Sequence, residues 1–179
     1  SFPSETEPVG ETWEIYEEHL SYLAKLIDTS EALSIQVHPG DEYARVHENS
    51  SGKTECWIIL EASSDAGIYL GLKPNITKGT LKKALLEKKQ INDLLNFYTV
   101  KPGDFFFVPA GSIHAIGKNV TLAEVQQNSG ITYRVWDWNR VDSNGVERDL
   151  HVEKSLDVIN FENELNTLKH FQFKSDLFK

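Results

Sequence analysis

Side chains that commonly bind metal ions recur at separate places in the 179-residue sequence: Gln36 and His38 in LSIQVHP, Glu55 in ECWIILE and His114 in PAGSIH. Two imidazoles, a carboxylate and an amide oxygen form a nitrogen and oxygen ligand set that suits zinc and tolerates manganese, iron or cobalt. The set contains no thiolate, which argues against a purely structural, cysteine-rich zinc site. A weak ligand such as Gln36 can leave room for water or substrate, so the set indicates a catalytic metal site.

The spacing of these residues supports a common site. LSIQVHP alternates apolar and polar residues, so Gln36 and His38 share one face of a predicted strand. The rise of a strand separates their Cβ atoms by roughly 6.5–7 Å, close enough to converge on one ion. His114 follows a glycine turn, an apolar strand and a Pro-Ala-Gly bend that would aim it inward. A lone strand histidine is more often a surface or hydrogen-bonded residue, so the prediction depends on the combination.

Short predicted strands supply the frame for these side chains. Strand-like segments separated by Gly, Pro and Asn turns recur at intervals of roughly 8–12 residues, which favours a β-sandwich or barrel. One helix is predicted from about Lys78 to Leu95, with Thr77 as its N-cap. EKSLDVI suits a short helix in the tail, and residues 11–28 fit either a short helix or a strand.

Composition limits the class of protein. The chain is long enough for one domain and short for two, so residues 1–179 are expected to form one domain with a helical insert at about 78–96 and a C-terminal extension at about 150–179. A net charge of −9 argues against nucleic-acid or anionic-membrane binding, yet a few local basic groups can still hold one phosphate. Cys56 is the single cysteine, and we expect a reducing cytoplasm.

Several motifs in order carry a family resemblance. Gly103, Pro109, Gly111 and His114 form a segment similar to the second cupin motif. Where the first cupin motif has His-x-His, this chain has Gln36-Val37-His38. With GKTECWIIL between them, the sequence resembles the class I, zinc-dependent mannose-6-phosphate isomerases from about Gly10 to Ile159. The resemblance implies a mainly β cupin jelly-roll barrel, that is, a double-stranded β-helix, with one helical insert and a short helical tail.

The resemblance also implies residues on the substrate side of the site. Lys53 matches the family's lysine two residues before the metal glutamate, and Arg134 matches its arginine about 20 residues after the last metal histidine. Glu124 matches the acidic residue between them, and the alternation of TLAEVQQ puts it on one face with Leu122. We expect Arg134 to stabilise charge, Lys53 to assist proton transfer or phosphate binding, and Glu124 to act as base or orienting group.

The function implied is aldose–ketose isomerisation between mannose 6-phosphate and fructose 6-phosphate through a cis-enediol, with one Zn²⁺ per chain. The alternatives are a metal-binding cupin that holds a sugar phosphate without turnover, and an isomerase of a different sugar phosphate. An iron dioxygenase is less well matched, because it needs open positions that a full Gln/His/Glu/His set does not leave. Family members are usually longer than 300 residues, so the pocket would be more open or completed by another chain, and a homo-oligomer is allowed.

Overall fold

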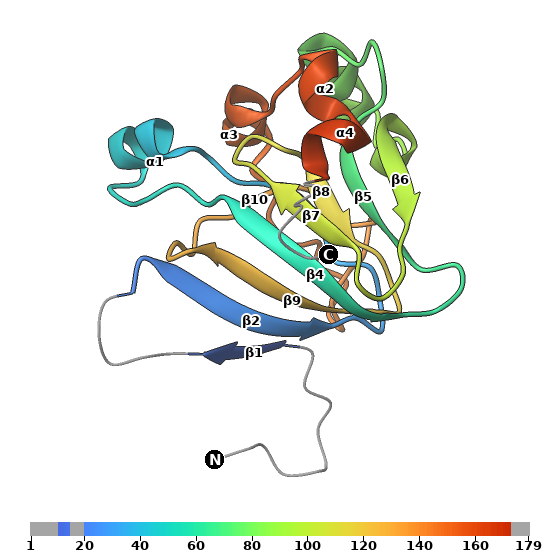
Figure 1. Cartoon of the computed structure of the whole chain (residues 1–179). Helices are drawn as coiled ribbons and strands as arrows, with labels where there is room; N and C mark the ends of the chain where they lie inside the picture. The colour runs from blue at the N-terminus through green and yellow to red at the C-terminus, as the bar shows by residue number, and fades with distance from the viewer. Residues whose placement is uncertain (1–10, 15–19, 173–179) are drawn as a thin grey trace.

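The structure is a computed structural model that describes residues 11–14 and 20–172. Strands dominate the first three quarters; one helix lies apart at residues 41–47, and the other helices are grouped in the insert and the tail (Figure 1). The elements are β1 (Glu11–Glu14), β2 (Tyr22–Asp28), β3 (Ile35–Val37), α1 (Asp41–His47), β4 (Glu55–Ala62), β5 (Gly67–Leu72), α2 (Lys78–Leu86), the 3-10 helix η1 (Ile91–Leu94), β6 (Leu95–Thr99), β7 (Phe105–Val108), β8 (His114–Ile116), β9 (Val120–Gln127), β10 (Tyr133–Trp136), α3 (Val152–Val158), the 3-10 helix η2 (Asn163–Asn166) and α4 (Leu168–Phe171).

The strands form two five-stranded antiparallel sheets. Sheet A has the order β1-β2-β9-β4-β7, and sheet B has the order β10-β3-β8-β5-β6. Apart from β1–β2 and β5–β6, strands that are neighbours in a sheet are not consecutive in the chain, which brings distant segments side by side. The expectation of a mainly β, barrel-like architecture is confirmed.

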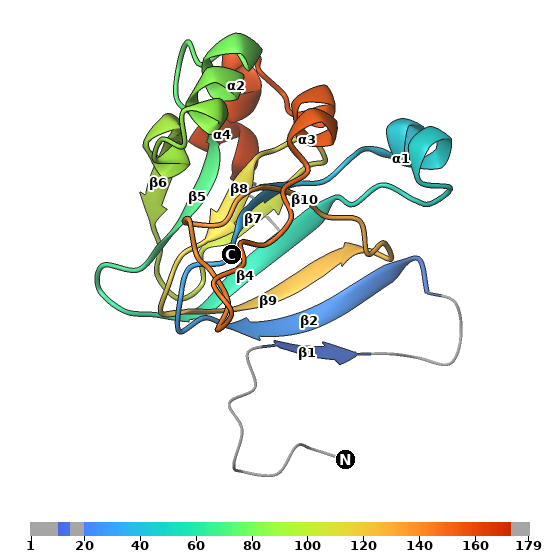
Figure 2. The same ribbon diagram turned by 180° about the vertical axis from the view of Figure 1, so that it is seen from behind.

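Two apolar clusters hold the sheets and helices together. One fills the space between the sheets and includes Trp57, Phe106 and Leu122 from sheet A and Ile68 and Leu70 from sheet B. The other lies on the opposite face of sheet B, where Ile35, Val37 and Val135 pack with Leu81 of α2 and Leu156 of α3. Figure 2 shows these helices gathered on the sheet B side of the molecule.

The helix predicted from Lys78 to Leu95 is wrong over its second half. α2 ends at Leu86, and Lys88 adopts a positive φ of 50° that leaves the helical path. Ile91 then belongs to η1, and Leu95 begins β6 with 1% of its surface exposed. Apolar residues every three or four positions fit a helix, but they fit a helix, turn and strand equally well. The N-cap was predicted correctly, since the Thr77 side chain accepts the Thr80 N–H.

In the ambiguous segment between residues 11 and 28, residues 11–14 and 22–28 form strands, and residues 15–19 lie outside the described part of the chain. β1 pairs with β2, and β2 pairs along its whole length with β9, from Tyr22 opposite Gln127 to Asp28 opposite Thr121. The predicted short helix in the tail is present as α3. The C-terminal extension was predicted to run to residue 179, and residues 173–179 lie outside the described part of the chain.

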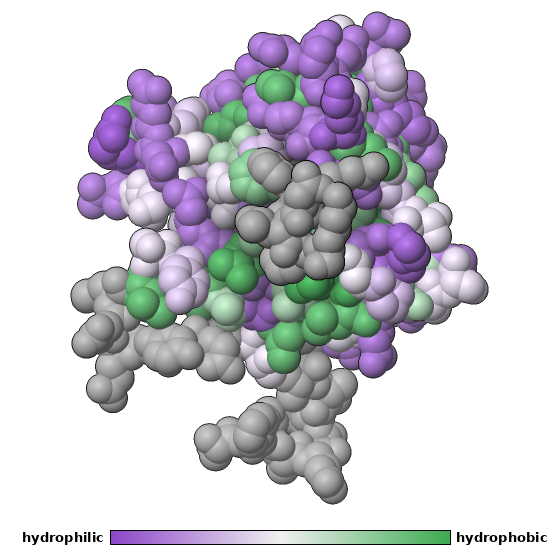
Figure 3. All heavy atoms as spheres, in the orientation of Figure 1, coloured by the Kyte–Doolittle hydropathy of each residue, from purple (hydrophilic) through white to green (hydrophobic). Residues whose placement is uncertain are grey.

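The outer face of sheet A carries partly exposed apolar side chains, which Figure 3 shows in green over the strands. They include Leu26, Ile58, Phe105 and Val125, each between 38% and 53% exposed. In the parts of the chain that the structure describes, no helix is long and apolar enough to cross a membrane.

Candidate metal centre

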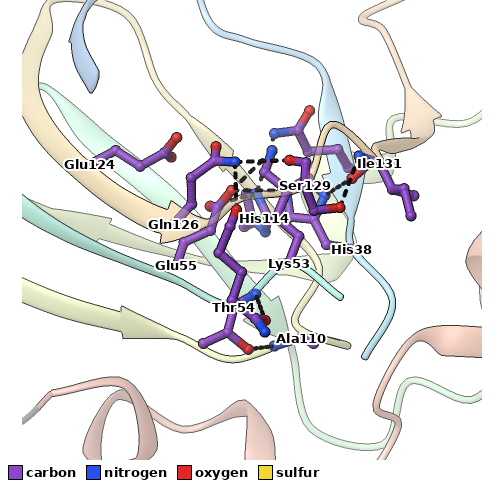
Figure 4. Close-up of polar contacts among 12 residues, drawn as sticks. His38, Lys53, Thr54, Glu55, Ala110, His114, Glu124, Gln126, Ser129 and Ile131 are labelled. Atoms are coloured by element: carbon purple, nitrogen blue, oxygen red, sulfur yellow. Dashed lines mark hydrogen bonds and ion pairs between the residues drawn. The ribbon is translucent and has the colours of Figure 1, made fainter. Parts of the chain in front are cut away.

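Three buried side chains converge at one end of the space between the sheets (Figure 4). His38 follows β3, Glu55 is the first residue of β4, and His114 is the first residue of β8. His38 Nε2 lies 3.2 Å from Glu55 Oε1, and His114 Nε2 lies 3.7 Å from Glu55 Oε2. All three residues are at most 2% exposed, and their ligand atoms lie within 4.8 Å of one another.

Main-chain carbonyls orient both imidazoles. His38 Nδ1 lies 2.8 Å from the carbonyl oxygen of Ile131, and His114 Nδ1 lies 3.0 Å from that of Ser112. A carbonyl only accepts hydrogen bonds, so each Nδ1 must carry the hydrogen. In its neutral form each ring therefore directs an unprotonated Nε2 atom at Glu55, the arrangement that metal-binding histidines adopt.

The charge state of the cluster also favours a cation. Burial by itself raises the pKa of Glu55, but the two imidazoles and Lys53 outweigh burial and hold that pKa well below its usual range. Burial lowers the pKa of His114 to about 4, against the opposing effect of Glu55. At neutral pH the centre therefore contains a carboxylate and a neutral His114 imidazole, which are the protonation states that metal ligands need.

The expected fourth ligand lies beside the other three. Gln36 is the register partner of His114 across β3 and β8, so both side chains point to the same face. The Gln36 amide nitrogen lies 3.3 Å from His114 Nε2 and donates to it. To hold a metal, the amide would have to turn by half a rotation and present its oxygen, since the nitrogen of an amide is not a ligand.

The unpartnered donor atoms of these residues and the distances between them fit a zinc ion. The Nε2 atom of His38 and both carboxylate oxygens of Glu55 are buried and have no hydrogen-bond partner. The donor atoms of His38 and His114 lie 3.2 and 3.7 Å from the oxygens of Glu55, close to the roughly 3.3 Å between donors that stand ~2.0–2.1 Å from a tetrahedral zinc. Buried polar atoms without partners are costly, and a cation at their centre would satisfy them.

Glu124 lies on β9 beside the metal centre, and its carboxyl group points toward that centre (Figure 4). Its Oε2 accepts the indole N–H of Trp57 at 2.9 Å, and Lys25 Nζ lies 3.6 Å from its Oε1. Burial, and after it the negative charge of Glu55, raises the pKa of Glu124 to about 7. A carboxyl group poised near neutral pH can both accept and donate a proton.

Lys53 and Arg134 differ in their relation to the centre. Lys53 is 6% exposed, and its Nζ lies 3.2 Å from Glu55 Oε1. Arg134 on β10 is the register partner of Gln36 and therefore faces the same side. Its Nη1 donates to the carbonyl of Asp149 at 2.9 Å, while its Nε is buried without a partner. The structure thus brings Lys53 into the cluster and Arg134 next to its edge.

Sequence reasoning missed three interior residues. Trp57 was part of a strand segment with no role assigned, Lys25 fell in the ambiguous segment, and Gln126 was overlooked. Gln126 is 2% exposed and lies opposite Glu55 in the register of β9 and β4. The signal for it was present, because alternation in TLAEVQQ puts Gln126 on the same face as Glu124.

Comparison with known proteins gives a consistent set of relatives. The chain is 45% identical over 155 residues to the mannose-6-phosphate isomerase ManA of Bacillus subtilis, covering 85% of this chain and 49% of the relative. It is 44% identical over 137 residues to the mannose-6-phosphate isomerase of Streptococcus mutans, covering 76% and 43%. The chain therefore spans about half the length of the curated relatives it matches. No family model matches the sequence.

Solved structures agree. The crystal structure of the mannose 6-phosphate isomerase from Bacillus subtilis superposes with a TM-score of 0.74 at 39% identity, covering 82% of this chain and 46% of that chain. A mutant phosphomannose isomerase from Salmonella typhimurium superposes with a TM-score of 0.58 at 17% identity, covering 80% and 55%, and supports the fold alone. The cupin-type fold expected from the sequence is confirmed.

Proposed function

We propose that this chain is a zinc-dependent isomerase that interconverts mannose 6-phosphate and fructose 6-phosphate. The chain belongs to the mannose-6-phosphate isomerase family and spans about half the length of its curated relatives. The observation that carries the proposal is the buried His38, Glu55 and His114 cluster, in which both imidazoles are oriented by carbonyls. Gln36 would complete the ligand set. A zinc ion held by these residues would act as a Lewis acid on a substrate oxygen.

The reaction moves one proton between two carbons. A base removes the proton from C2 of the open-chain aldose while the C1 carbonyl oxygen gains a proton, which gives the cis-enediol. Return of the proton to C1 and loss of the proton on the C2 oxygen give the ketose. The chain must therefore supply a group that accepts and returns a proton, and positive charge near the two oxygens.

We assign the base to Glu124. Its pKa of about 7 leaves a large fraction of the carboxyl group ionised at neutral pH and lets the same group return the proton. Trp57 and Lys25 hold its two oxygens, at 2.9 and 3.6 Å, so the carboxylate is fixed in direction. Both partners lower its pKa and counteract burial, which keeps part of the group ionised.

We assign to Lys53 and Arg134 the role of supplying positive charge near the substrate. The buried ammonium of Lys53 would donate to a substrate oxygen near the centre, and the Arg134 guanidinium would bind the phosphate or the charge that develops on the enediol. Support for Arg134 is that its Nε is buried without a partner and faces the side of Gln36. A reducing compartment such as the cytoplasm fits the free Cys56 thiol.

The second candidate is a metal-holding cupin that binds a sugar phosphate without turnover. One observation favours it: the Arg134 guanidinium is already engaged, since its Nη1 donates to the Asp149 carbonyl at 2.9 Å. Both candidates predict bound zinc, and turnover separates them.

A coupled assay of fructose 6-phosphate formation from mannose 6-phosphate decides between them. We expect turnover with zinc-loaded protein, loss of turnover with a chelator and recovery on zinc addition. Protein that holds zinc, binds mannose 6-phosphate and shows no turnover would establish the second candidate. Protein that binds no zinc would overturn both.

A further inference from the structure

Gln126 uses its side chain to hold a main-chain turn. Its amide nitrogen donates to the carbonyls of Gln127 and Ser129 at 3.0 and 2.9 Å. These carbonyls belong to the turn that leaves β9 and leads toward β10. Gln126 is almost fully buried, and Figure 4 shows its amide aimed at Ser129 from the inside of the barrel. The turn therefore depends on an interior side chain rather than on solvent.

The same turn is held from a second side by Ser129. The Ser129 hydroxyl donates to the carbonyl of Ser51 at 2.9 Å and accepts the N–H of Ile131. Ser51 precedes Lys53, so Ser129 ties the turn to the segment that enters β4. Two independent side chains thus fix the path of residues 128–131.

The turn carries the carbonyl that orients a metal ligand. The carbonyl oxygen of Ile131 lies 2.8 Å from His38 Nδ1. If the turn moved, Nδ1 would lose its acceptor, and the ring would no longer be committed to the tautomer that leaves Nε2 unprotonated. Ring partners of this kind usually change metal affinity by 10–100-fold when they are removed.

We propose that Gln126 is a positioning residue for the metal centre: by holding the 128–131 turn, it keeps the Ile131 carbonyl on His38 Nδ1 and Nε2 free to bind. The inference rests on the proposed metal site. It concerns a residue that acts on the metal centre through Ser129, Ile131 and His38.

The test compares two amide residues with matched bonding. Gln126→Met keeps the size of the side chain and removes its donors. Asn96→Leu is the control, because Asn96 on β6 also donates one amide nitrogen to two carbonyls, those of Leu72 and Asn166, at 3.0 and 2.9 Å. It lies in sheet B, away from the turn.

Two readouts are taken on each protein. Imidazole ¹⁵N shifts in metal-free protein report the His38 tautomer, and a zinc titration against a competing chelator reports Kd. We expect Gln126→Met to introduce Nε2-protonated His38 and to weaken zinc binding by about 10–100-fold, while Asn96→Leu changes neither at a similar loss of stability.

An unchanged His38 tautomer in Gln126→Met, or the same change in Asn96→Leu, would overturn the proposal. Should Gln126→Met fail to fold, Ser129→Ala loosens the same turn from its other side and must shift the tautomer in the same direction. The tautomer is measured without metal, so the two failures are distinguishable: wild-type protein that binds no zinc would refute the proposed function, and a tautomer shift in Gln126→Met would still show that Gln126 positions the His38 ring.

Discussion

The indole N–H of Trp57 donates to Glu124 Oε2 at 2.9 Å, and the Trp57 ring stands edge-on to the His114 ring with centroids 5.3 Å apart. One side chain therefore contacts both the carboxyl group that we assign as base and an imidazole of the metal centre. Because the hydrogen bond goes to Glu124, substitutions at Trp57 should affect proton transfer more than they affect metal content.

Removing the indole donor should shift the pH dependence of activity. The Trp57 hydrogen bond lowers the pKa of Glu124, so Trp57→Phe should raise that pKa and move the rising limb of the kcat/KM profile to higher pH. Zinc content should be unchanged. Phe106→Leu is the control, since Phe106 is the register partner of Trp57 and is buried, but makes no bond to Glu124. Equal profiles for Trp57→Phe and wild type would remove Glu124 from the titrating step.

The pKa of Glu124 should also appear in the stability of the metal-free protein. Its folded pKa is about 7, raised by burial from 4.5, so the folded chain keeps a proton that the unfolded chain releases. This contribution is fully present below about pH 4.5 and is lost as pH rises through about 7. Glu124→Gln should therefore gain stability relative to wild type on going from pH 5 to pH 8, by up to roughly 3 kcal/mol.

Urea unfolding of both proteins at the two pH values, with chelator present, measures this difference. The comparison with Glu124→Gln cancels the opposite contribution of Glu55, whose lowered pKa is common to both proteins. A difference in unfolding free energy that does not change with pH would contradict the raised pKa.

Zinc should raise the unfolding free energy of the chain. An ion that binds only the folded state at 100 times its Kd adds about 2.7 kcal/mol, which for a chain of 179 residues raises Tm by roughly 5–10 °C. His38→Ala should abolish most of this shift, because it removes a ligand. His47→Ala serves as the control, since His47 is exposed on α1. Calorimetry with and without zinc gives the shift, and no shift in wild type would argue against a folded-state metal site.

Arg134→Ala should lower kcat/KM for the sugar phosphate by roughly 100-fold through loss of charge stabilisation. Bound zinc, measured by atomic absorption, should stay at wild-type level, because no ligand is removed. Arg134→Lys should recover only part of the loss, since an ammonium cannot reproduce the forked donors of a guanidinium. Arg148→Ala removes a nearby arginine whose side chain is 57% exposed and should retain most activity. Full activity of Arg134→Ala would refute the assignment.

The convergence of His38, Glu55 and His114 was predictable because these residues stand in short motifs whose local geometry is set by alternation and turns. Glu124 was predictable for the same reason, since an acidic residue in register with Leu122 must enter the interior of a two-sheet fold. The role of Gln126 in holding the 128–131 turn was not predicted, because that role depends on hydrogen bonds to a turn that exists only in the folded chain. The sequence around Arg134 also does not indicate that one guanidinium N–H donates to the Asp149 carbonyl.

The helix boundary failed for a different physical reason. Ile91 and Leu95 are as deeply buried as helix residues would be, so their spacing carries no information on whether the chain between them is helical. The change of direction at Lys88 depends on a left-handed backbone conformation, which a lysine in the sequence does not indicate.

The proposed metal ligands come from both sheets: Gln36 and His114 lie on strands of sheet B, and Glu55 lies on β4 of sheet A. A bound ion would therefore act as a cross-link between the two sheets, much as a disulfide does between distant segments of a secreted protein. Losing it would cost the fold more than the local contacts of one site, because a direct link between the two sheets would be lost at that end. Amide exchange in β3, β8 and the start of β4 should accordingly be the most sensitive to metal removal.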